Sequence, residues 1–475
     1  MIKKLFSKSE RGQAIILVAF AIIGMVAIIG LMTDGGMLLI EYARLKRGID
    51  AASIAAAQQF RKGFTNADLE NAGREFLQFN QSDADQIHIY TCDYLNTEHD
   101  ATLCTTPIRK LVRVTATRTV NFGFMRVVGI NSTTITATSV SEAASIDLVL
   151  VIDTSASMAY ETSGDPNISD PGDDPSVCNL NNTCQPMADV KAIARQFVSS
   201  TMFFPYDRVA IVTLTSQTPG GNRAPSIPFR LTDPGDVDNA LAGLTVFEPE
   251  DCPTASGSGP CLQYNTGSYF LDCPTFTDPT SANWGINPSS CTSSNVGGAL
   301  LLAGSEFAVP PIRSDSFWVI ISLIGGPANA STPSAADAVD VVYQNGYCPS
   351  STWLSPFCRD ALSATRHPSI GAGSNLYDAE DYARDQADFV ANPKTGQGVT
   401  MFTIGLGNLI RGAPSGDADA AEKLLQYIAL NAGDDTATPK TYTANHGTYS
   451  FAPDTSELGK IFLEISKNII TRISQ

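Results

Sequence analysis

The stretch that decides the fold is IDLVLVIDTSAS, residues 146–157. The apolar run over residues 146–152 predicts a buried strand, and a turn rich in oxygen atoms follows it. Asp153, Ser155 and Ser157 are alternate residues, which point the same way on a tight turn at the carboxyl end of a strand. Carboxylate and hydroxyl oxygens suit a hard cation such as Mg²⁺. The pattern indicates a metal site on a loop, and the alternative is a Ser/Asp helix cap after a strand.

These residues resemble the metal-ion-dependent adhesion site of the von Willebrand factor A family, and the resemblance covers residues 145–475. A second matching loop starts at Ser294, where the family usually has Thr, and opens a helix through a Gly-Gly pair. The resemblance implies that Ser294 is a fourth metal ligand beside Asp153, Ser155 and Ser157.

One departure from the family pattern affects the metal. After the strand that ends at Leu323 the family usually carries Thr-Asp-Gly, whose Asp binds the metal through water, whereas this chain has Ile324-Gly325-Gly326. Asp153 is then the single anionic ligand, and affinity for hard cations depends on the number of charged ligands. Two alternatives follow: a site for Mg²⁺ or Mn²⁺, or an A domain that binds partners without a metal.

Further apolar segments alternate with amphipathic helical patterns, at residues 207–214, 317–323, 398–407 and 449–453. This alternation predicts an α/β fold with a doubly wound, mostly parallel sheet, the fold that the family resemblance also implies.

Three loops of this region are longer than the family minimum and rich in Gly, Pro, Ser, Asp and Cys: residues 160–186, 247–291 and 327–373. Loops at the carboxyl ends of the strands surround the binding site in such sheets. We expect the three insertions to build a recognition surface over the Asp153 loop, and the alternative is that they are protease-resistant decoration. The cluster of Asp165, Asp170, Asp173 and Asp174 is a calcium candidate, although Asp-Pro-Gly runs are more often solvated turns.

The amino terminus predicts a membrane anchor. Residues 13–32 contain no charge and are numerous enough to cross the hydrocarbon core of a bilayer. We predict a basic cytoplasmic tail at residues 1–12 and a transmembrane helix at 13–33. The alternative is a cleaved signal peptide, but the apolar region is longer than such peptides usually have.

Ten cysteines all lie beyond this segment and fall into five local couples: 92 with 104, 178 with 184, 252 with 261, 273 with 291, and 348 with 358. An even number in close couples predicts disulfides, which persist in oxidising compartments. We therefore expect a membrane protein whose bulk lies outside the cytoplasm. The sequence contains no Cys-x-x-Cys pair and no cluster of His, so zinc binding by these cysteines is not favoured.

The segments at residues 11–14, 34–36 and 44–57 resemble the TadE/TadG-like amino-terminal segment of tight-adherence (Flp) pilus proteins, which implies a bacterial membrane protein. Strong helix formers predict one long helix through this region. Alternating patterns at residues 110–118 and 133–139 predict a small sheet beyond it. We expect a transmembrane helix and a small α+β pilin-like stem over 34–143, followed by the A-like domain over 144–475.

A net charge of −17 argues against a nucleic acid partner, and the chain has no hydrolase, P-loop or metalloprotease motif, so we expect no enzyme. Two functions remain. The protein is an anchored adhesin that binds a protein ligand or another pilus or surface component around the Asp153 loop, or it is a structural pilin-like subunit or assembly factor whose A domain packs against neighbours.

Overall fold

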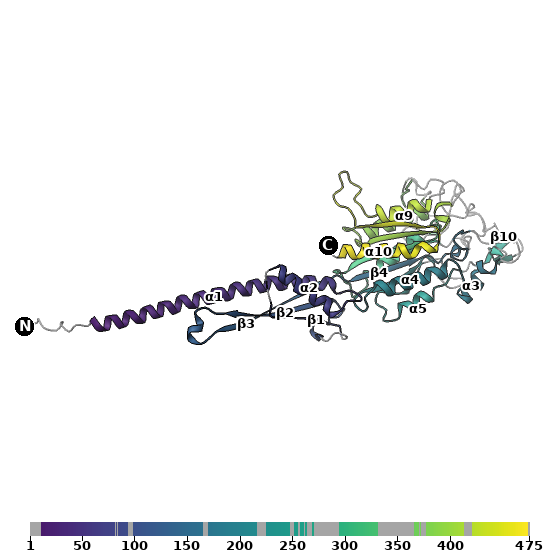
Figure 1. Cartoon of the computed structure of the whole chain (residues 1–475). Helices are drawn as coiled ribbons and strands as arrows, with labels where there is room; N and C mark the ends of the chain where they lie inside the picture. Colours follow the sequence, from purple (N-terminus) through teal and green to yellow (C-terminus); the bar gives the residue numbers. More distant parts are fainter. Residues whose placement is uncertain are drawn as a thin grey trace, which may run out of the picture. The chain divides into compact units, whose positions relative to one another are not determined.

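The chain divides into two compact units, Met1–Ala144 and Ser145–Gln475, and each is described by itself (Figure 1). Side chains at residues 11–14, 171 and 251–269 lie outside the description. The computed structural model describes residues 11–80, 82, 84–93, 98–164, 170–215, 225–247, 251–254, 257–260, 262–263, 268–269, 294–330, 365–369, 371, 377–412 and 420–473.

The first unit begins with the long helix that its Ala-rich sequence predicts, α1 (Arg11–Gln59). Its part from residue 15 onward is long and apolar enough to cross a membrane, by length and composition. Its carboxyl half instead buries one face, where Leu45, Ile49 and Ala56 are fully buried. One helix therefore combines a candidate membrane span with part of the core of this unit.

A second helix and a small sheet complete this core. Helix α2 (Asn66–Phe79) starts with a capping box, in which the Thr65 hydroxyl accepts the backbone N–H of Asp68 and the Asp68 carboxylate accepts the backbone N–H of Thr65. The sheet is antiparallel in the order β1-β2-β3. Its strands and the short helices between them are β1 (Gln86–Thr91), η1 (Ala101–Leu103), β2 (Lys110–Asn121), η2 (Met125–Val128) and β3 (Ser132–Ala143).

The second unit is built on a six-stranded sheet in the order β13-β12-β11-β4-β5-β6. All neighbouring strands are parallel except β5 and β6, which confirms the predicted doubly wound, mostly parallel sheet. The strands are β4 (Ile146–Ile152), β5 (Arg208–Thr213), β6 (Ser226–Phe229), β11 (Phe317–Ile324), β12 (Thr400–Leu406) and β13 (His446–Ala452). The two short pairs are β7 (Asp251–Thr254) with β8 (Gly257–Pro260), and β9 (Leu262–Gln263) with β10 (Ser268–Tyr269).

Helices cover both faces of this sheet. Leu148 and Leu150 of β4 join the core beneath α4 (Met187–Thr201), α5 (Val237–Ala242) and α10 (Leu458–Ile473). Val149 and Val151 face the other way, toward α6 (Val296–Glu306), α7 (Ala379–Ala391) and α9 (Ala420–Leu430). The remaining short helices are η3 (Ala156–Ala159), η4 (Pro171–Asp173), α3 (Pro175–Asn181), α8 (Leu409–Gly412) and η7 (Thr455–Glu457).

Asp147 is the polar exception in the apolar strand β4, and it is fully buried. Arg208 donates to both of its carboxylate oxygens, at 2.9 and 2.5 Å, and Arg313 forms a second ion pair with it. Arg313 also donates to the carbonyl of Tyr206 at 2.6 Å. A buried carboxylate is tolerated when paired and hydrogen-bonded in this way, so Asp147 acts at the amino end of the strand as an anchor for its neighbours.

Candidate functional site

The candidate site lies where β4 and β11 separate into different loops. After β4 the chain continues to β5, which pairs with one edge of β4, and the later strand β11 pairs with the other edge. Ligands of open α/β sheets bind outside the carboxyl ends of the strands at such a switch point. The backbone N–H of Asp153 still donates to the carbonyl of Leu323, at 2.9 Å, so the two strands stay joined up to the first residue of the loop.

The Asp153 carboxylate connects the loops after β4 and β11. It is fully buried, and its two oxygens accept the backbone N–H groups of Ser155 at 2.8 Å and Gly325 at 2.7 Å. Burial raises the pKa of Asp153 above its ordinary value, although hydrogen bonds from Ser155 and Gly325 act in the opposite direction. A nearby cation would favour the ionised carboxylate.

The two serines of the loop lie together. The Oγ atoms of Ser155 and Ser157 are 3.0 Å apart, and Ser155 is buried while Ser157 is half-buried. Ser155 precedes the short helix η3, but its side chain makes no capping hydrogen bond there. The structure therefore brings Asp153, Ser155 and Ser157 into one loop, and the Ser155 hydroxyl does not serve as a helix cap.

Ser294 is tied to the segment that follows β11. Its backbone N–H donates to Asn329 Oδ1 at 2.8 Å, and its carbonyl accepts from the backbone N–H of Asn329 at 3.0 Å. The next residue, Asn295, caps α6 by accepting from Gly298 N–H. Ser294 Oγ is buried, and no described residue is its hydrogen-bond partner. Because buried hydroxyls are normally hydrogen-bonded, an unpartnered one fits an oxygen that is kept for a ligand.

Gly325, the departure from the family pattern, lies beside the other candidate ligands. A Cβ added to it would come within 3.4 Å of Asp153 Oδ2 and 4.0 Å of Ser157 Oγ. Its tightest neighbour would be Met158 Sδ at 3.0 Å, the flexible end of a side chain. Gly326 differs, because a Cβ there would face Leu409 at 3.6 Å. A side chain at Gly325 would thus point at the Asp153 carboxylate.

The donor set of this edge is one carboxylate with serine hydroxyls. In the described part of the chain, no group of three or more His, Cys, Asp and Glu side chains is placed to hold a metal ion. Neutral hydroxyls with a single carboxylate suit a hard cation bound weakly, and they do not suit zinc, which prefers nitrogen and sulfur.

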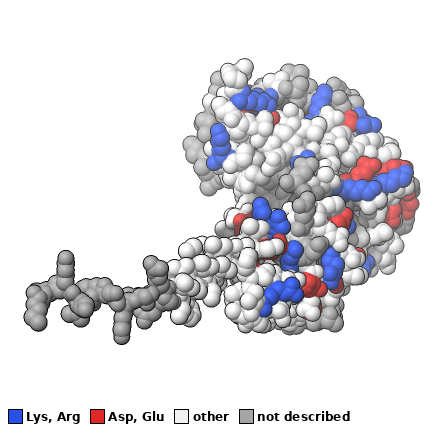
Figure 2. Space-filling model, turned by 60° about the vertical axis from the view of Figure 1, so that its left-hand side comes forward, with Lys and Arg blue, Asp and Glu red and all other residues white. Residues whose placement is uncertain are grey.

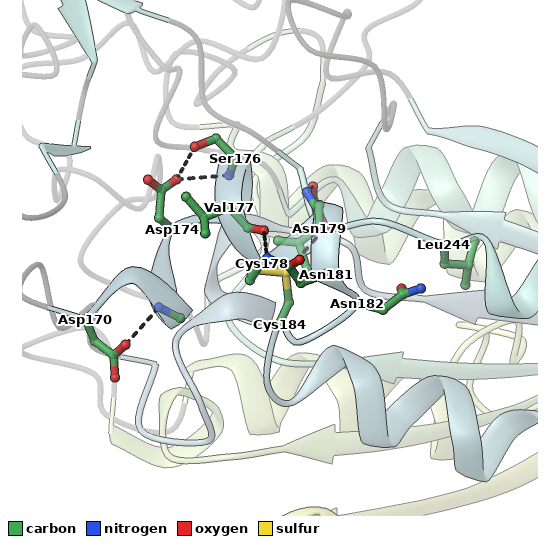
Figure 3. Close-up of a disulfide and its surroundings, with 12 residues drawn as sticks. Asp170, Asp174, Ser176, Val177, Cys178, Asn179, Asn181, Asn182, Cys184 and Leu244 are labelled. Atoms are coloured by element: carbon green, nitrogen blue, oxygen red, sulfur yellow. Dashed lines mark hydrogen bonds between the residues drawn. A yellow bond between two sulfur atoms is a disulfide. The ribbon is translucent and has the colours of Figure 1, made fainter.

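The first insertion is ordered around α3 and a disulfide between Cys178 and Cys184 (Figure 3). The side chain of Asn179 pairs with the backbone of Val246 in both directions, each at 2.8 Å. The next residue, Phe247, donates its N–H to the carbonyl of Thr154 at 2.7 Å. A chain of hydrogen bonds therefore links the first insertion to the start of the second insertion, and from there to the Asp153 loop.

Lys191 of α4 adds hydrogen bonds between the first insertion and the segment that precedes the second insertion. Its Nζ donates to Asn182 Oδ1 at 2.5 Å and to the carbonyls of Leu244 and Ala242 at 2.9 and 3.2 Å. Burial lowers the pKa of Lys191, and the charge of Arg195 adds to the effect. Neither Asn179 nor Lys191 was predicted from the sequence, because the backbone groups that they bind lie 51 to 67 residues away in the chain.

Two aspartates of the first insertion, Asp170 and Asp174, serve local turns. Asp170 accepts from Gly172 N–H, and Asp174 caps α3 by accepting from Ser176 N–H (Figure 3). Asp165 lies outside the described residues. So do most of residues 247–291 and 327–373, together with the side chains of the couples 252 with 261, 273 with 291, and 348 with 358. The predicted couples Cys92 with Cys104 and Cys178 with Cys184 are confirmed as disulfides.

Replacing Asn179 with alanine is expected to lower the free energy of unfolding of the second unit by about 1–3 kcal/mol, because the backbone of the buried Val246 loses both partners. All three Trp lie in this unit, so their fluorescence during urea denaturation reports on it. Asn181→Ala is the control, since that exposed side chain on the same helix makes one local bond; it should change stability by less than about 0.5 kcal/mol. Equal losses of unfolding free energy in both variants would show that the bonds between Asn179 and Val246 do not stabilise the second unit.

The first comparison with known proteins concerns α1. Residues 12–59 match the family model described as "Putative Flp pilus-assembly TadE/G-like". No curated protein matches the chain.

Solved structures with some likeness include pilus and byssus proteins. The PilB minor pilin from Streptococcus sanguinis shares 13% identity over 76% of each chain, with a TM-score of 0.37. The vWF domain of the type V pili tip protein Mfa5 from Porphyromonas gingivalis shares 15% identity over 70% of this chain and 98% of that one, with a TM-score of 0.34. Proximal thread matrix protein 1 from the mussel byssus, solved with a zinc occupied MIDAS motif, shares 12% identity over 69% of this chain and 46% of that one, with a TM-score of 0.30.

Identities and TM-scores this low establish no function for this chain. The family match is confined to α1, and there it confirms the TadE/TadG-like resemblance that the amino-terminal sequence predicts.

Proposed function

We propose that this protein is a membrane-anchored component of a tight-adherence (Flp) pilus system whose second unit binds a protein partner at the loops around Asp153, with a divalent cation as an optional part of the contact. The observations that carry the proposal are that Asp153, Ser155 and Ser157 share the loop at the carboxyl end of β4, and that Ser294 is bonded to the segment after the neighbouring strand β11. Among the described residues, Ser294 Oγ is buried without a hydrogen-bond partner. The family match of α1 supports the pilus context. The proposal includes no catalytic step.

The charge of the site explains why the cation is optional. One carboxylate and three hydroxyls give a cation little binding energy, because affinity grows with the number of charged ligands. A carboxylate from an Asp or Glu of the partner would supply the second negative charge. Mg²⁺ or Mn²⁺ would then bind well only when partner and protein hold it together, through Asp153, Ser155, Ser157 and Ser294.

Restoring the missing carboxylate tests the metal part of this proposal. Gly325→Asp is expected to tighten Mn²⁺ and Mg²⁺ binding at least about tenfold. The new carboxylate would accept a hydrogen bond from a water bound to the cation, and a hydrogen bond to a charged group is worth about 1.5–3 kcal/mol, more than the 1.4 kcal/mol that a tenfold change requires. Without a cation the same variant should unfold at a lower temperature than the parent, since its new carboxylate lies close to Asp153. Calorimetric titration of the full chain in detergent measures the first effect and thermal unfolding the second.

Gly326→Asp is the matched control, because its side chain would face Leu409 and not Asp153. It should bind cations no better than the parent. If Gly325→Asp and Gly326→Asp behave alike, or if Asp153→Ala leaves the binding in Gly325→Asp intact, the cation does not bind at this loop.

We also propose that residues 13–33 span the membrane, with their amino-terminal side in the cytoplasm and the rest of the chain outside. The apolar α1 and the two disulfides support this orientation, because disulfides persist in oxidising compartments. A tag placed after Gln475 should be digested by protease added to intact spheroplasts. Digestion only after lysis would reverse the orientation, and a shortened soluble product would show a cleaved signal.

Partner binding and a purely structural role give different results in cells. Ser157→Lys places a cation at the half-buried hydroxyl of the site, and we expect it to abolish adherence while pilus number, counted by electron microscopy, stays normal. Asn181→Lys, on the exposed side of the first insertion, should keep both. Loss of pili in Ser157→Lys with normal tryptophan fluorescence would favour the structural role, and unchanged adherence would place partner binding elsewhere.

A further inference from the structure

The tip of the β2–β3 hairpin exposes an unusual number of apolar side chains. Within residues 122–131, Val127 is 87% exposed, Val128 71%, Phe124 47% and Ile130 45%. Arg126 is the single charged residue of this stretch. Exposed apolar side chains scattered singly need no explanation, whereas several in one tight loop indicate a surface that contacts something apolar.

Asp34 fixes this tip against α1. Its carboxylate accepts the backbone N–H groups of Gly123 and Phe124, both at 2.9 Å, and of Met125 at 2.7 Å. Asp34 is only 4% exposed and directly follows the uncharged run of α1. A turn before it, a Cβ on Gly30 would come within 2.7 Å of the Phe124 Cβ. The tip is therefore held at the level where the apolar run ends.

The rest of the hairpin runs along the carboxyl half of α1. Lys46 Nζ donates to the carbonyl of Thr138 at 2.9 Å, and the hydroxyls of Ser53 and Ser141 lie 2.7 Å apart. From residue 34 to residue 53, α1 rises about 28 Å, and β3 covers about 30 Å between residues 132 and 141. These lengths agree, so the strand follows the helix axis, its tip toward the apolar end of α1 (Figure 1).

That apolar end has its side chains in the open. Along residues 15–29 every side chain of α1 is exposed, and no residue from 12 to 33 is charged. The described residues of this projecting arm are white in Figure 2. A helix apolar on all sides is covered by lipid if it spans a membrane. The tip then lies at the boundary between acyl chains and headgroups.

We propose that the tip, residues 122–131, is a second membrane contact, inserted into the interface of the leaflet from which α1 emerges. This inference rests on the proposed membrane span. Phe124, Val127, Val128 and Ile130 would enter the acyl boundary, where interfacial apolar residues are buried by roughly 5–10 Å. Arg126 would face the lipid phosphates, a favourable position for a cation in the headgroup region. Helix and tip together would set the angle of the stem on the membrane.

Tryptophan quenching in lipid nanodiscs tests the tip on the full chain. Val127→Trp reports on the tip, Ile22→Trp on the span, and Val140→Trp, half exposed near the other end of the same hairpin, is the matched control. The signal of the parent, with its three Trp in the second unit, is subtracted. Lipids brominated on their acyl chains quench a Trp that lies in the membrane, and aqueous iodide quenches one that lies in water.

The expected result is that brominated lipid quenches Val127→Trp and Ile22→Trp while iodide does not reach them, and that Val140→Trp shows the reverse. If Ile22→Trp is quenched by brominated lipid but Val127→Trp is quenched only by iodide, the tip proposal fails and the span stands. Shielding of Val127→Trp from both quenchers would assign the tip to a protein contact and overturn the lipid contact. If Ile22→Trp is not quenched by lipid, the span fails and the tip proposal fails with it.

Discussion

The second unit depends on the burial of β4 on both faces and along both edges. Parallel neighbours take up its backbone groups on either side, and its alternate side chains enter two separate cores. A strand in this position has no free edge, so its apolar run must end where the neighbours diverge. Beyond that point the Asp153 carboxylate replaces the backbone hydrogen bonds between the strands, because it accepts the N–H of Gly325 from the loop after the adjacent strand. The site exists because the sheet divides there.

Two buried aspartates at opposite ends of β4 show how environment separates structural from functional carboxylates. Asp147 faces two arginines, so its charge is neutralised within the fold. The described hydrogen-bond partners of Asp153 are backbone N–H groups and a serine hydroxyl, and burial raises the pKa of Asp153. A carboxylate that is desolvated without a cationic partner is the kind of group found at binding sites. The glycine at position 325 makes this contrast sharper, because the loop after β11 offers no carboxylate there.

The sequence predicted most of what depends on local pattern. The strands β4, β5, β11 and β12 stand out as apolar runs, and the long α1 follows from its Ala-rich composition. The short edge strand β6 was not predicted, because it is four residues long and contains Pro228. Of the candidate site, the alternate spacing after β4 was enough to place Asp153, Ser155 and Ser157 on one loop.

Long-range side-chain bonds could not be predicted in the same way. The bridge from Asn179 to Val246 and the clamp from Asp34 to Gly123 join residues 67 and 89 positions apart. Neither side chain belongs to a pattern with a period, and each is an ordinary polar residue until the tertiary fold supplies its backbone partners. The unpartnered hydroxyl of Ser294 is likewise visible only once the segment around Asn329 has folded against it.

The direction of β3 along α1 has a mechanical consequence. With α1 anchored in a membrane as proposed, a pull on the second unit would enter the first unit through the carboxyl end of β3, at Ala143, and would be resisted by α1. Because β3 runs alongside β2 and α1, such a force slides the strand lengthwise past both and does not peel it away. All twelve paired residues between β2 and β3 then resist together, from Lys110 with Ala143 to Asn121 with Ser132. Under shear the load is shared by all hydrogen-bonded pairs between the two strands, whereas a force that peeled the strands apart would load one pair after another.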